Sequence, residues 1–409
     1  MRVLVCYPWL DLGGAPKTSI ALAKGLKERG HDVYFFSKRG GMYERLLEEA
    51  GIPLISAPYH PFLPLMFHLN SKAYRILKNA IEEYSIDIVH VFHPNHYFLS
   101  LLIAPWRNIP VLFTAVWHQD KHYYPAYPGR VIFVAEEFLD HQKPYIGKRA
   151  RKMIVLPNRV DLDRFGPDVD WRGFARDAGL PESGTKIALM SRLDSMKEKS
   201  VYYAMNAARI LSERGTDIIL AVAGDGALYK QFAEYGARIN SSRHREIIKF
   251  IGGIERTPEF LSWADIILGV GRSSFEGMAA RKPTCIVGEN GLAGVVDSDT
   301  VEELQYYNFA GRNIKSPVEP SVLAGTIEEI MEDREKYARL AEFSRRYVLE
   351  NYGYRAGAEK LEKIYEEALG EEPLSPYEKT MVFVTSFLTG YCRNLYRTGK
   401  AKIKETLFG

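Results

Sequence analysis

Two cations near the middle of the chain are placed where they could bind a phosphate-bearing ligand. Arg192 and Lys197 stand in the string MSRLDSMKEKS (190–200), directly after an apolar run typical of a buried strand. A guanidinium can bind two phosphate oxygens at once and an ammonium acts as a point charge, so the pair could neutralise a diphosphate leaving group. The plain alternative is a solvated loop, the commoner fate of arginine and lysine. The two residues alone leave both interpretations open.

A second segment, GRSSFEGMAARKP (271–283), follows another apolar run and begins a helical pattern. Gly271 and the amides after it would form an anion site of the helix N-terminus type. Ser273 and Glu276 also spell the S-x-x-E of a capping box, in which the glutamate reaches back to the serine amide. The functional alternative is that the Glu276 carboxylate accepts hydrogen bonds from a ribose diol.

A pair of glycines lies between the first apolar run and the first helical pattern. Gly13 and Gly14, in LGGAPKTS (12–19), would let the backbone approach a ligand, and the amides at the helix start favour anions. The string is neither GxGxxG nor a P-loop, and an ordinary strand-to-helix turn also uses glycine. It is a candidate whose weight depends on the rest of the chain.

Candidate metal ligands occur, but their setting argues against a metal site. Three D-x-D pairs lie in a loop or in the segment between the two halves, where chance explains them better than metal binding does. Five histidines cluster late in the first half, but Pro94 interrupts the run, so a shared helical face is not expected. The pairs are Asp161–Asp163, Asp168–Asp170 and Asp297–Asp299, and the histidines are His90, His93, His96, His118 and His122. We expect no metal; hydrogen bonding in a cleft suits the histidines better, and core or surface roles stay open for most.

The bulk composition is that of an ordinary globular protein. Of the 409 residues, 46% are hydrophobic and 26% charged, and the net charge of +3 does not point to nucleic acid. Cys6, Cys285 and Cys392 are far apart and support neither a disulfide framework nor a zinc site. The first residues do not show the pattern of a secretory signal. We therefore expect a cytoplasmic protein.

Three segments combine apolar, aromatic or basic residues in a way that suggests a surface contact. PYHPFLPLMFHL (58–69) is aromatic and apolar where a loop is expected, while IGKRARK (146–152) and YCRNLYRTGKAKIK (391–404) are basic. A peripheral contact with anionic lipid head groups is one interpretation. The other is an apolar contact between lobes with solvated charges. The apolar stretch 381–392 is too short to span a bilayer.

The candidate residues fall within a repeated alternation of short apolar runs and helical patterns. Near-continuous apolar strands between helices indicate a parallel sheet covered on both faces. The polar, proline-bearing segment 157–170 separates two such series, so we expect two Rossmann-like α/β lobes facing across a cleft. The expected domains are an N-terminal lobe (1–160), a C-terminal lobe (161–370) and a helical tail (371–409), for which packing back on the first lobe is one option. Ligands of open parallel sheets bind at the carboxyl ends of strands.

The order of motifs resembles the GT-B glycosyltransferases, particularly the retaining, nucleotide-sugar-dependent family 4, over about residues 2 to 368. No single motif is decisive, but all of them in the right order are specific. They begin with GGAPKTSIALAKGLKERGHDV, which looks like the family's glycine loop and first helix. The later ones are DIVHVFHP, PVLFTAVWH, IVLPNRVDLDRFGP, MSRLDSMKEK, VAGDGALY and SSFEGMAARKP.

The resemblance implies a role for each matching position. Arg192 and Lys197 would hold the donor diphosphate, and Glu276 the ribose hydroxyls. The acceptor would lie on the side of the first lobe, where His118 would face the reacting sugar. The remaining implied donor contacts are Gly13 and Gly14 under the diphosphate, amides near Ser273 and Ser274 at the phosphates, and the turn from Gly252 to Ile254 at the base.

Several positions depart from the family pattern. The family often has two glutamates separated by seven residues, and counting back from Glu276 leads to Leu268 within an apolar strand. Arg159, Glu198 and Arg281 stand where the family usually has glycine. These changes leave donor binding in place and bear on the sugar contacts.

The predicted function is therefore transfer of a sugar from a nucleotide diphosphate sugar, with retention of configuration and without a metal or other cofactor. The acceptor is open among a glycan, a lipid-linked molecule and a small molecule, in carbohydrate biosynthesis. Two alternatives remain, a nucleotide-sugar epimerase on the same fold and a sugar-nucleotide-binding protein without turnover. A donor screen separates them.

Overall fold

The computed structural model describes residues 1–11, 13–58, 67–116, 129–146 and 152–388, which divide into two compact units. The first unit combines Met1–Arg159 with Tyr354–Gly409, and the second is Val160–Gly353. The division between Arg159 and Val160 lies beside the expected boundary at residue 160. The expected end of the second lobe at 370 differs from it, because the helix after Tyr354 belongs with the first unit.

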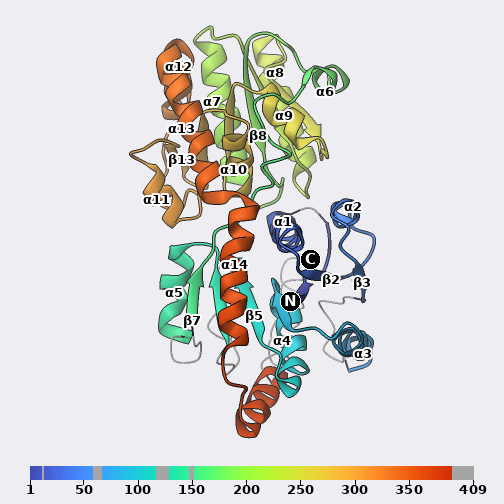
Figure 1. Cartoon of the computed structure of the whole chain (residues 1–409). Coiled ribbons are helices and arrows are strands. Elements are labelled where there is room, and N and C mark those ends of the chain that lie inside the picture. The colour runs from blue at the N-terminus through green and yellow to red at the C-terminus, as the bar shows by residue number, and fades with distance from the viewer. Residues whose placement is uncertain (12, 59–66, 117–128, 147–151, 389–409) are drawn as a thin grey trace, which may run out of the picture. The chain divides into compact units, whose positions relative to one another are not determined.

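The first unit is a seven-stranded parallel sheet with the order β3-β2-β1-β4-β5-β6-β7 in its described part. Its strands are β1 (Arg2–Cys6), β2 (Asp32–Ser37), β3 (Leu54–Ser56), β4 (Ile88–Val91), β5 (Val111–Ala115), β6 (Arg130–Phe133) and β7 (Lys152–Val155). Its helices are α1 (Gly14–Glu28), α2 (Glu44–Glu49), α3 (Phe67–Glu83), α4 (Pro94–Leu101), η1 (Ala104–Arg107), α5 (Glu136–Ile146) and α14 (Tyr354–Leu369), followed by a helix over 376–388. Figure 1 shows them along the colour ramp.

Helix α14 joins the first unit through close packing and specific polar contacts with α1 and the sheet. A Cβ on Gly25 of α1 would lie only 2.7 Å from the Ala358 Cβ, so the two helices approach closely because both positions are small. The Tyr354 hydroxyl donates to Glu28 at 2.7 Å, and the Tyr365 hydroxyl lies 2.7 Å from Nδ1 of buried His90. Sequence periodicity predicts that this helix has an apolar face, but not which sheet the face covers.

The second unit contains a six-stranded sheet in the order β10-β9-β8-β11-β12-β13. Its strands are β8 (Thr185–Met190), β9 (Ile218–Ala223), β10 (Ile248–Gly252), β11 (Ile266–Gly269), β12 (Thr284–Gly288) and β13 (Gly291–Val295). Its helices are α6 (Arg172–Asp177), α7 (Glu198–Glu213), α8 (Tyr229–Arg243), α9 (Thr257–Trp263), α10 (Arg272–Ala279), α11 (Val301–Tyr306), α12 (Pro320–Glu332) and α13 (Arg334–Tyr352). The edge strand β13 runs antiparallel to β12, which the sequence interpretation did not predict.

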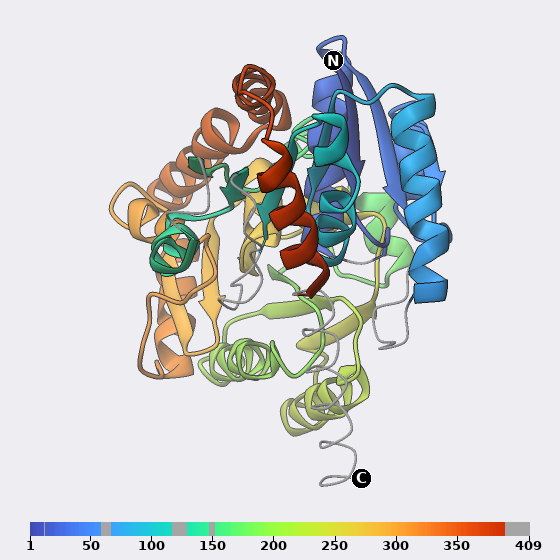
Figure 2. The ribbon, with the colours of Figure 1, turned by 90° about the horizontal axis from the view of Figure 1, so that it is seen from below.

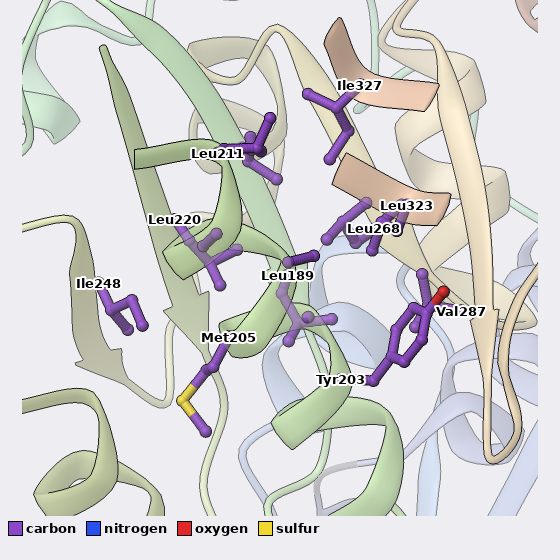
Figure 3. Close-up of a cluster of buried hydrophobic side chains, with 14 of the residues drawn as sticks. Leu189, Tyr203, Met205, Leu211, Leu220, Ile248, Leu268, Val287, Leu323 and Ile327 are labelled. Atoms are coloured by element: carbon purple, nitrogen blue, oxygen red, sulfur yellow. The ribbon is translucent and has the colours of Figure 1, made fainter. Parts of the chain in front are cut away.

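The second sheet is covered on both faces, as its near-continuous apolar strands predict. Figure 3 shows one of these layers, in which Leu189 of β8 and Leu268 of β11 meet α7 and α12. On the other face, Phe275 of α10 and Tyr352 of α13 stack with ring centroids 4.2 Å apart. Burial of these side chains stabilises each layer by about 1.5–3 kcal/mol per fully buried large apolar residue. The covered sheet thus holds its strand ends in fixed positions.

Candidate functional site

The centre of the second sheet brings two strand ends together. From β8 the chain crosses through α7 to β9 on one side, while β11 pairs with β8 on the other side. Leu189 of β8 lies in register with Leu268 of β11, so both strands end at the same level. Such a reversal of strand order opens a crevice at the carboxyl ends of the strands. The segment with Arg192 and Lys197 therefore lies beside the start of α10.

The segment after β8 is held by a turn after β9 that only glycine permits. The Ser191 amide donates to Ala223 O at 3.0 Å, and the Leu193 amide donates to Asp225 O at 2.9 Å. Gly224 has φ +144°, and a Cβ there would lie 1.8 Å from Ser191 O. A side chain would displace the segment, since no backbone atom can move aside cheaply at that distance. The G-D-G turn thus fixes the backbone on both sides of Arg192.

Helix α10 begins after a glycine with a positive φ, and two serines in its first turn hydrogen-bond to the backbone that precedes them. Gly271 is the N-cap residue, with φ +57°, and its amide donates to Phe309 O at 2.7 Å. The Ser273 hydroxyl lies 3.0 Å from Val270 O and accepts from the Val270 amide at 3.2 Å. The Ser274 hydroxyl donates to Gly271 O at 2.6 Å. The two hydroxyls thus bond the backbone just before and at the helix start, which fixes the orientation of the first helical turn.

The capping-box interpretation of Glu276 is wrong. The box requires the serine to be the N-cap residue, but the helix begins at Arg272, so Ser273 is already its second residue. Instead, Glu276 Oε1 accepts from Arg272 Nε at 2.8 Å, one turn earlier on the same helix. The carboxylate is 1% exposed, and a buried charge of this kind needs a partner. Arg272, which the sequence interpretation did not single out, is that partner.

The cations of the crevice act on one another. Lys197 is half-buried at the start of α7, and its pKa is lowered mainly by burial and then by the nearby charge of Arg192. Arg312 also lowers this pKa, while Asp194 opposes the shift and forms a 3.4 Å ion pair with Arg192. Arg192 and Arg312 are thus both near enough to Lys197 to act on its charge. Sequence reasoning missed Arg312, because it lies in irregular chain after α11 and no motif marks it.

Comparison with known proteins agrees with this geometry. The family description "Glycosyltransferase Family 4" matches residues 12–164, and "Glycosyl transferases group 1" matches residues 174–347. Together the two matches cover most of both units. The chain belongs to the GT-B glycosyltransferases.

Individual relatives support the assignment of this glycosyltransferase. The chain is 25% identical over 299 residues to "Putative glycosyltransferase EpsD" of Bacillus subtilis (strain 168). This match covers 67% of this chain and 75% of the relative. A solved glycosyltransferase from Rickettsia africae ESF-5 matches with TM-score 0.72 and 21% identity, covering 91% of this chain and 99% of the other. Anabaena Alr3699/HepE, solved with UDP and glucose, matches with TM-score 0.67 and 16% identity. This match covers 90% of this chain and 99% of the other. These structures share the fold.

The turn predicted to meet the base lies beside the G-D-G turn. Gly252 ends β10 with φ +71°, and its carbonyl accepts from the Gly224 amide at 2.8 Å. Ile254 is half-buried against the core of the second unit. In this glycosyltransferase Gly252 and Ile254 are therefore joined, through Gly224, to the segment that carries Arg192. Contact with a base stays a prediction.

The predicted residues of the first unit are only partly described. Gly13 is the N-cap residue of α1 and Gly14 its first residue, as the glycine-loop interpretation requires. Their role toward a donor stays a prediction. His118 and His122 fall within 117–128, outside the described residues.

The remaining histidines of the predicted cluster have different settings in the first unit. His90 and His96 are buried, and burial lowers the pKa of each to about 3, so both are neutral near pH 7. The His90 Nε2 lies 2.7 Å from the Thr114 hydroxyl. His93 instead caps α4, accepting from the Asn95 amide at 3.3 Å. The structure thus assigns His90 to the core rather than to a ligand-binding cleft.

The D-x-D pairs make local turns. Asp161 accepts from the Asp163 amide at 3.2 Å, and Asp170 accepts from the Arg172 amide at 3.1 Å. Asp297 accepts from the amides of Asp299 and Thr300. Within the described residues, no group of three or more His, Cys, Asp or Glu side chains could hold a metal ion.

Two of the family's usual glycine positions are accommodated in this glycosyltransferase without glycine. Arg281 adopts φ +59°, the left-handed conformation that favours glycine, and pairs with Glu342 at 2.9 Å. Arg159 is 1% exposed and lies against Gly357, where a Cβ would come within 2.6 Å of the arginine. Leu268, to which counting back from Glu276 leads, is buried in β11, so the family's first glutamate has no counterpart at that spacing.

The segments suggested for membrane contact lie largely outside the described residues. These are 59–66 of the first segment, 147–151 of the second and all of 391–404. A search of the described helices finds none long and apolar enough to cross a bilayer.

Proposed function

We propose that this glycosyltransferase transfers a sugar from a nucleotide diphosphate sugar that is bound by the second unit. The observation that carries the proposal is that Lys197, shortly after β8, interacts electrostatically with Arg192 and Arg312, at the sheet edge where β11 leads into α10. Anabaena Alr3699/HepE is described in complex with UDP-glucose, and a starch synthase IV catalytic domain from Arabidopsis thaliana is described as bound to ADP. Both ligands contain the diphosphate that such a crevice suits.

The chemistry follows from where charge develops. As the bond between the anomeric carbon and the diphosphate breaks, its electron pair stays on the phosphate oxygen. The acceptor hydroxyl oxygen forms the new bond to carbon, and its proton passes to the departing diphosphate. Arg192 and Lys197 would neutralise the departing charge, and the amides at the start of α10 would add a positive dipole end. The G-D-G turn holds the segment that carries Arg192 in place before the reaction, so little reorganisation of this segment is needed during it.

Glu276 would hold the ribose hydroxyls. Its carboxylate accepts a hydrogen bond from Arg272 Nε at 2.8 Å. Arg272 would thus orient the Glu276 carboxylate. Retention of configuration, independence from metal and an acceptor on the side of the first unit belong to the proposal through the family resemblance.

A screen of labelled nucleotide sugars tests the proposal. The full chain is incubated with UDP-, GDP-, ADP- and dTDP-sugars, with and without EDTA. Release of one nucleoside diphosphate, coupled to a glycosylated product and unaffected by EDTA, is the expected result. An epimerised donor would instead indicate an epimerase, and binding without turnover a non-catalytic protein. Proton NMR of the product shows whether the anomeric configuration is kept.

A further inference from the structure

The helix over 376–388 in the first unit has a well-defined start. The Glu378 amide donates to the Ser375 hydroxyl at 3.3 Å, and the Ser375 amide donates to the Glu378 carboxylate at 2.8 Å. This reciprocal pair is a capping box, with Pro376 at the first helical position. The local sequence therefore specifies the helix independently of what its outer face contacts.

One side of this helix packs on the first unit. Val382 is completely buried in the hydrophobic core beside α3 and α4, and Ser386, one turn later, is 1% exposed. Leu374, just before the helix, packs against the same core. Lys379 donates to the Asn108 side chain at 2.7 Å, which ties the helix to the end of η1. Figures 1 and 2 show this last, red helix against the first unit.

The other side exposes a stripe of large apolar residues. Tyr377, Met381, Val384 and Leu388 are spaced as one face of a helix, with exposures of 74%, 38%, 43% and 52%. Phe383 and Phe387 widen the stripe. Six of the twelve exposed large hydrophobic side chains in the described chain thus lie within twelve consecutive residues. Scattered apolar residues need no explanation, but a contiguous apolar surface indicates a contact.

An exposed tryptophan lies in the neighbouring element η1. Trp106, in η1, is 48% exposed, and η1 is followed directly by Asn108, the partner of Lys379. Tryptophan is enriched where protein meets the boundary between water and lipid, because its ring is apolar and its N–H polar. We call the outward stripe the C-terminal apolar face.

The sequence after the helix supplies the charge that chooses between occupants. Residues 389–409 contain five basic side chains and one acidic one. The basic residues are Arg393, Arg397, Lys400, Lys402 and Lys404, and the acidic one is Glu405. A helix with an exposed apolar face next to a basic segment suits the surface of an anionic bilayer, which takes up the apolar face and attracts the cations. A second copy of the chain would bring like charges together.

We propose that the C-terminal apolar face, with the basic segment after it, docks the protein on anionic lipid surfaces. The helix lies in the plane of the head groups with Tyr377, Met381, Val384 and Leu388 toward the lipid. This surface is distinct from the proposed donor crevice, and docking does not depend on catalysis.

Vesicle co-sedimentation of the full chain tests the docking. Vesicles of phosphatidylcholine with one quarter phosphatidylglycerol should bind the protein at low salt, and vesicles of phosphatidylcholine alone should bind it at least about tenfold more weakly. The variant M381S/V384S/L388S should lower partitioning by at least about tenfold, because the lost contacts are apolar. Reversal of charge at Lys400, Lys402 and Lys404 to glutamate should give a loss of similar size that disappears at high salt.

The chain offers a matched control. M42S/V322S/L349S removes one methionine, one valine and one leucine with exposures of 38%, 48% and 42%, away from the helix. This variant should partition like the parent, and both triple variants should keep its melting temperature within a few degrees. Quenching of tryptophan fluorescence by brominated lipid should be weaker in W106F.

Three results would overturn the proposal. One is the absence of sedimentation even at low salt, and another is equal binding to neutral vesicles. The third is unchanged binding of M381S/V384S/L388S. A dimer that dissociates in that variant, seen by sedimentation velocity without any vesicle binding, would assign the face to a second copy instead.

Discussion

The two units begin a helix in the same way, yet their surroundings differ. In the first unit α1 starts after Gly13, and in the second unit α10 starts after Gly271, in both cases without a side-chain cap. Lys17, in the first turn of α1, lies over the ring of Tyr43 with its Nζ 5.4 Å from the centroid. Lys197 instead lies among the charges of Arg192 and Arg312. In the proposed function, the start of α10 serves as an anion site because a neighbouring strand end supplies cations, whereas Lys17 at the start of α1 lies over an aromatic ring instead.

The largest expected effect comes from removing those cations. R192A and K197A should each weaken binding of UDP or ADP about tenfold to a hundredfold, from a lost charge-assisted hydrogen bond of about 1.5–3 kcal/mol. The double variant should lose at least about a hundredfold, measured by calorimetry. K17A is the matched change at α1 and should alter affinity by less than about twofold. If K17A weakens nucleotide binding as much as K197A does, the proposed difference between the two helix starts is wrong.

The next effect tests whether the G-D-G turn positions the cations. In G224A the new Cβ meets Ser191 O at 1.8 Å and must displace the segment that carries Arg192. Affinity for the nucleoside diphosphate should fall about tenfold, with a loss of roughly 1–3 kcal/mol in the free energy of unfolding. G215A is the control, since Gly215 has φ +93° but nothing within 4 Å of a Cβ. If both variants bind alike, the turn has no positioning role.

A smaller effect is expected at Glu276. E276Q keeps an acceptor for Arg272 but removes the charge, so the hydrogen bonds to a ribose diol should weaken by about 1 kcal/mol, or about fivefold in donor affinity. The free energy of unfolding should fall by about 1–3 kcal/mol, because glutamine fills the same buried space but leaves the Arg272 charge without its carboxylate partner. The comparison between UDP and pyrophosphate sharpens the test, since pyrophosphate has no ribose and should bind both proteins equally. If E276Q binds UDP with wild-type affinity, the proposed contact between Glu276 and the ribose is wrong.

The smallest effect is a pH dependence. Burial and Arg192 lower the pKa of Lys197 below its ordinary value, so the ammonium loses its proton at a lower pH than an exposed lysine does. Affinity for a diphosphate should therefore fall by a few fold as pH rises through this lowered pKa, and binding at alkaline pH should take up a proton. K197R, which stays charged, should flatten the profile. Calorimetry in buffers of different ionisation enthalpy measures the proton uptake, and an equal alkaline fall in K197R would contradict the assignment.

How far the sequence predicts this molecule depends on the range of the forces involved. The apolar periodicity of β8 and β11 and the cations after β8 are local features, and the alternation of strands and helices predicts their meeting at one sheet edge. The capping-box prediction at Ser273 and Glu276 was wrong because S-x-x-E also fits a helix whose N-cap lies two residues earlier. Gly271, with φ +57°, is that N-cap. Strand β13 was missed because GLAGV is short and rich in small residues.

Non-local packing sets the other limit. The apolar face of α14 is visible in the sequence, but its contact with α1 depends on Gly25 and Ala358, which lie more than 300 residues apart. Arg312 was not foreseen for the same reason, since it reaches the crevice through tertiary structure alone. Periodicity specifies elements, whereas partners that are distant along the chain require the packed structure.

The division of the chain has a consequence for its synthesis. The second unit is one continuous stretch whose ends meet, because Val160 pairs with Gly353 and its amide donates to Tyr352 O at 2.9 Å. The first unit needs α14, which leaves the ribosome only after the whole second unit has been made. Although domains that emerge first generally fold first, here the later half can complete its fold while the earlier half still waits for its last helix. Until α14 has been made, the apolar surface that it covers in the first unit stays exposed and open to aggregation.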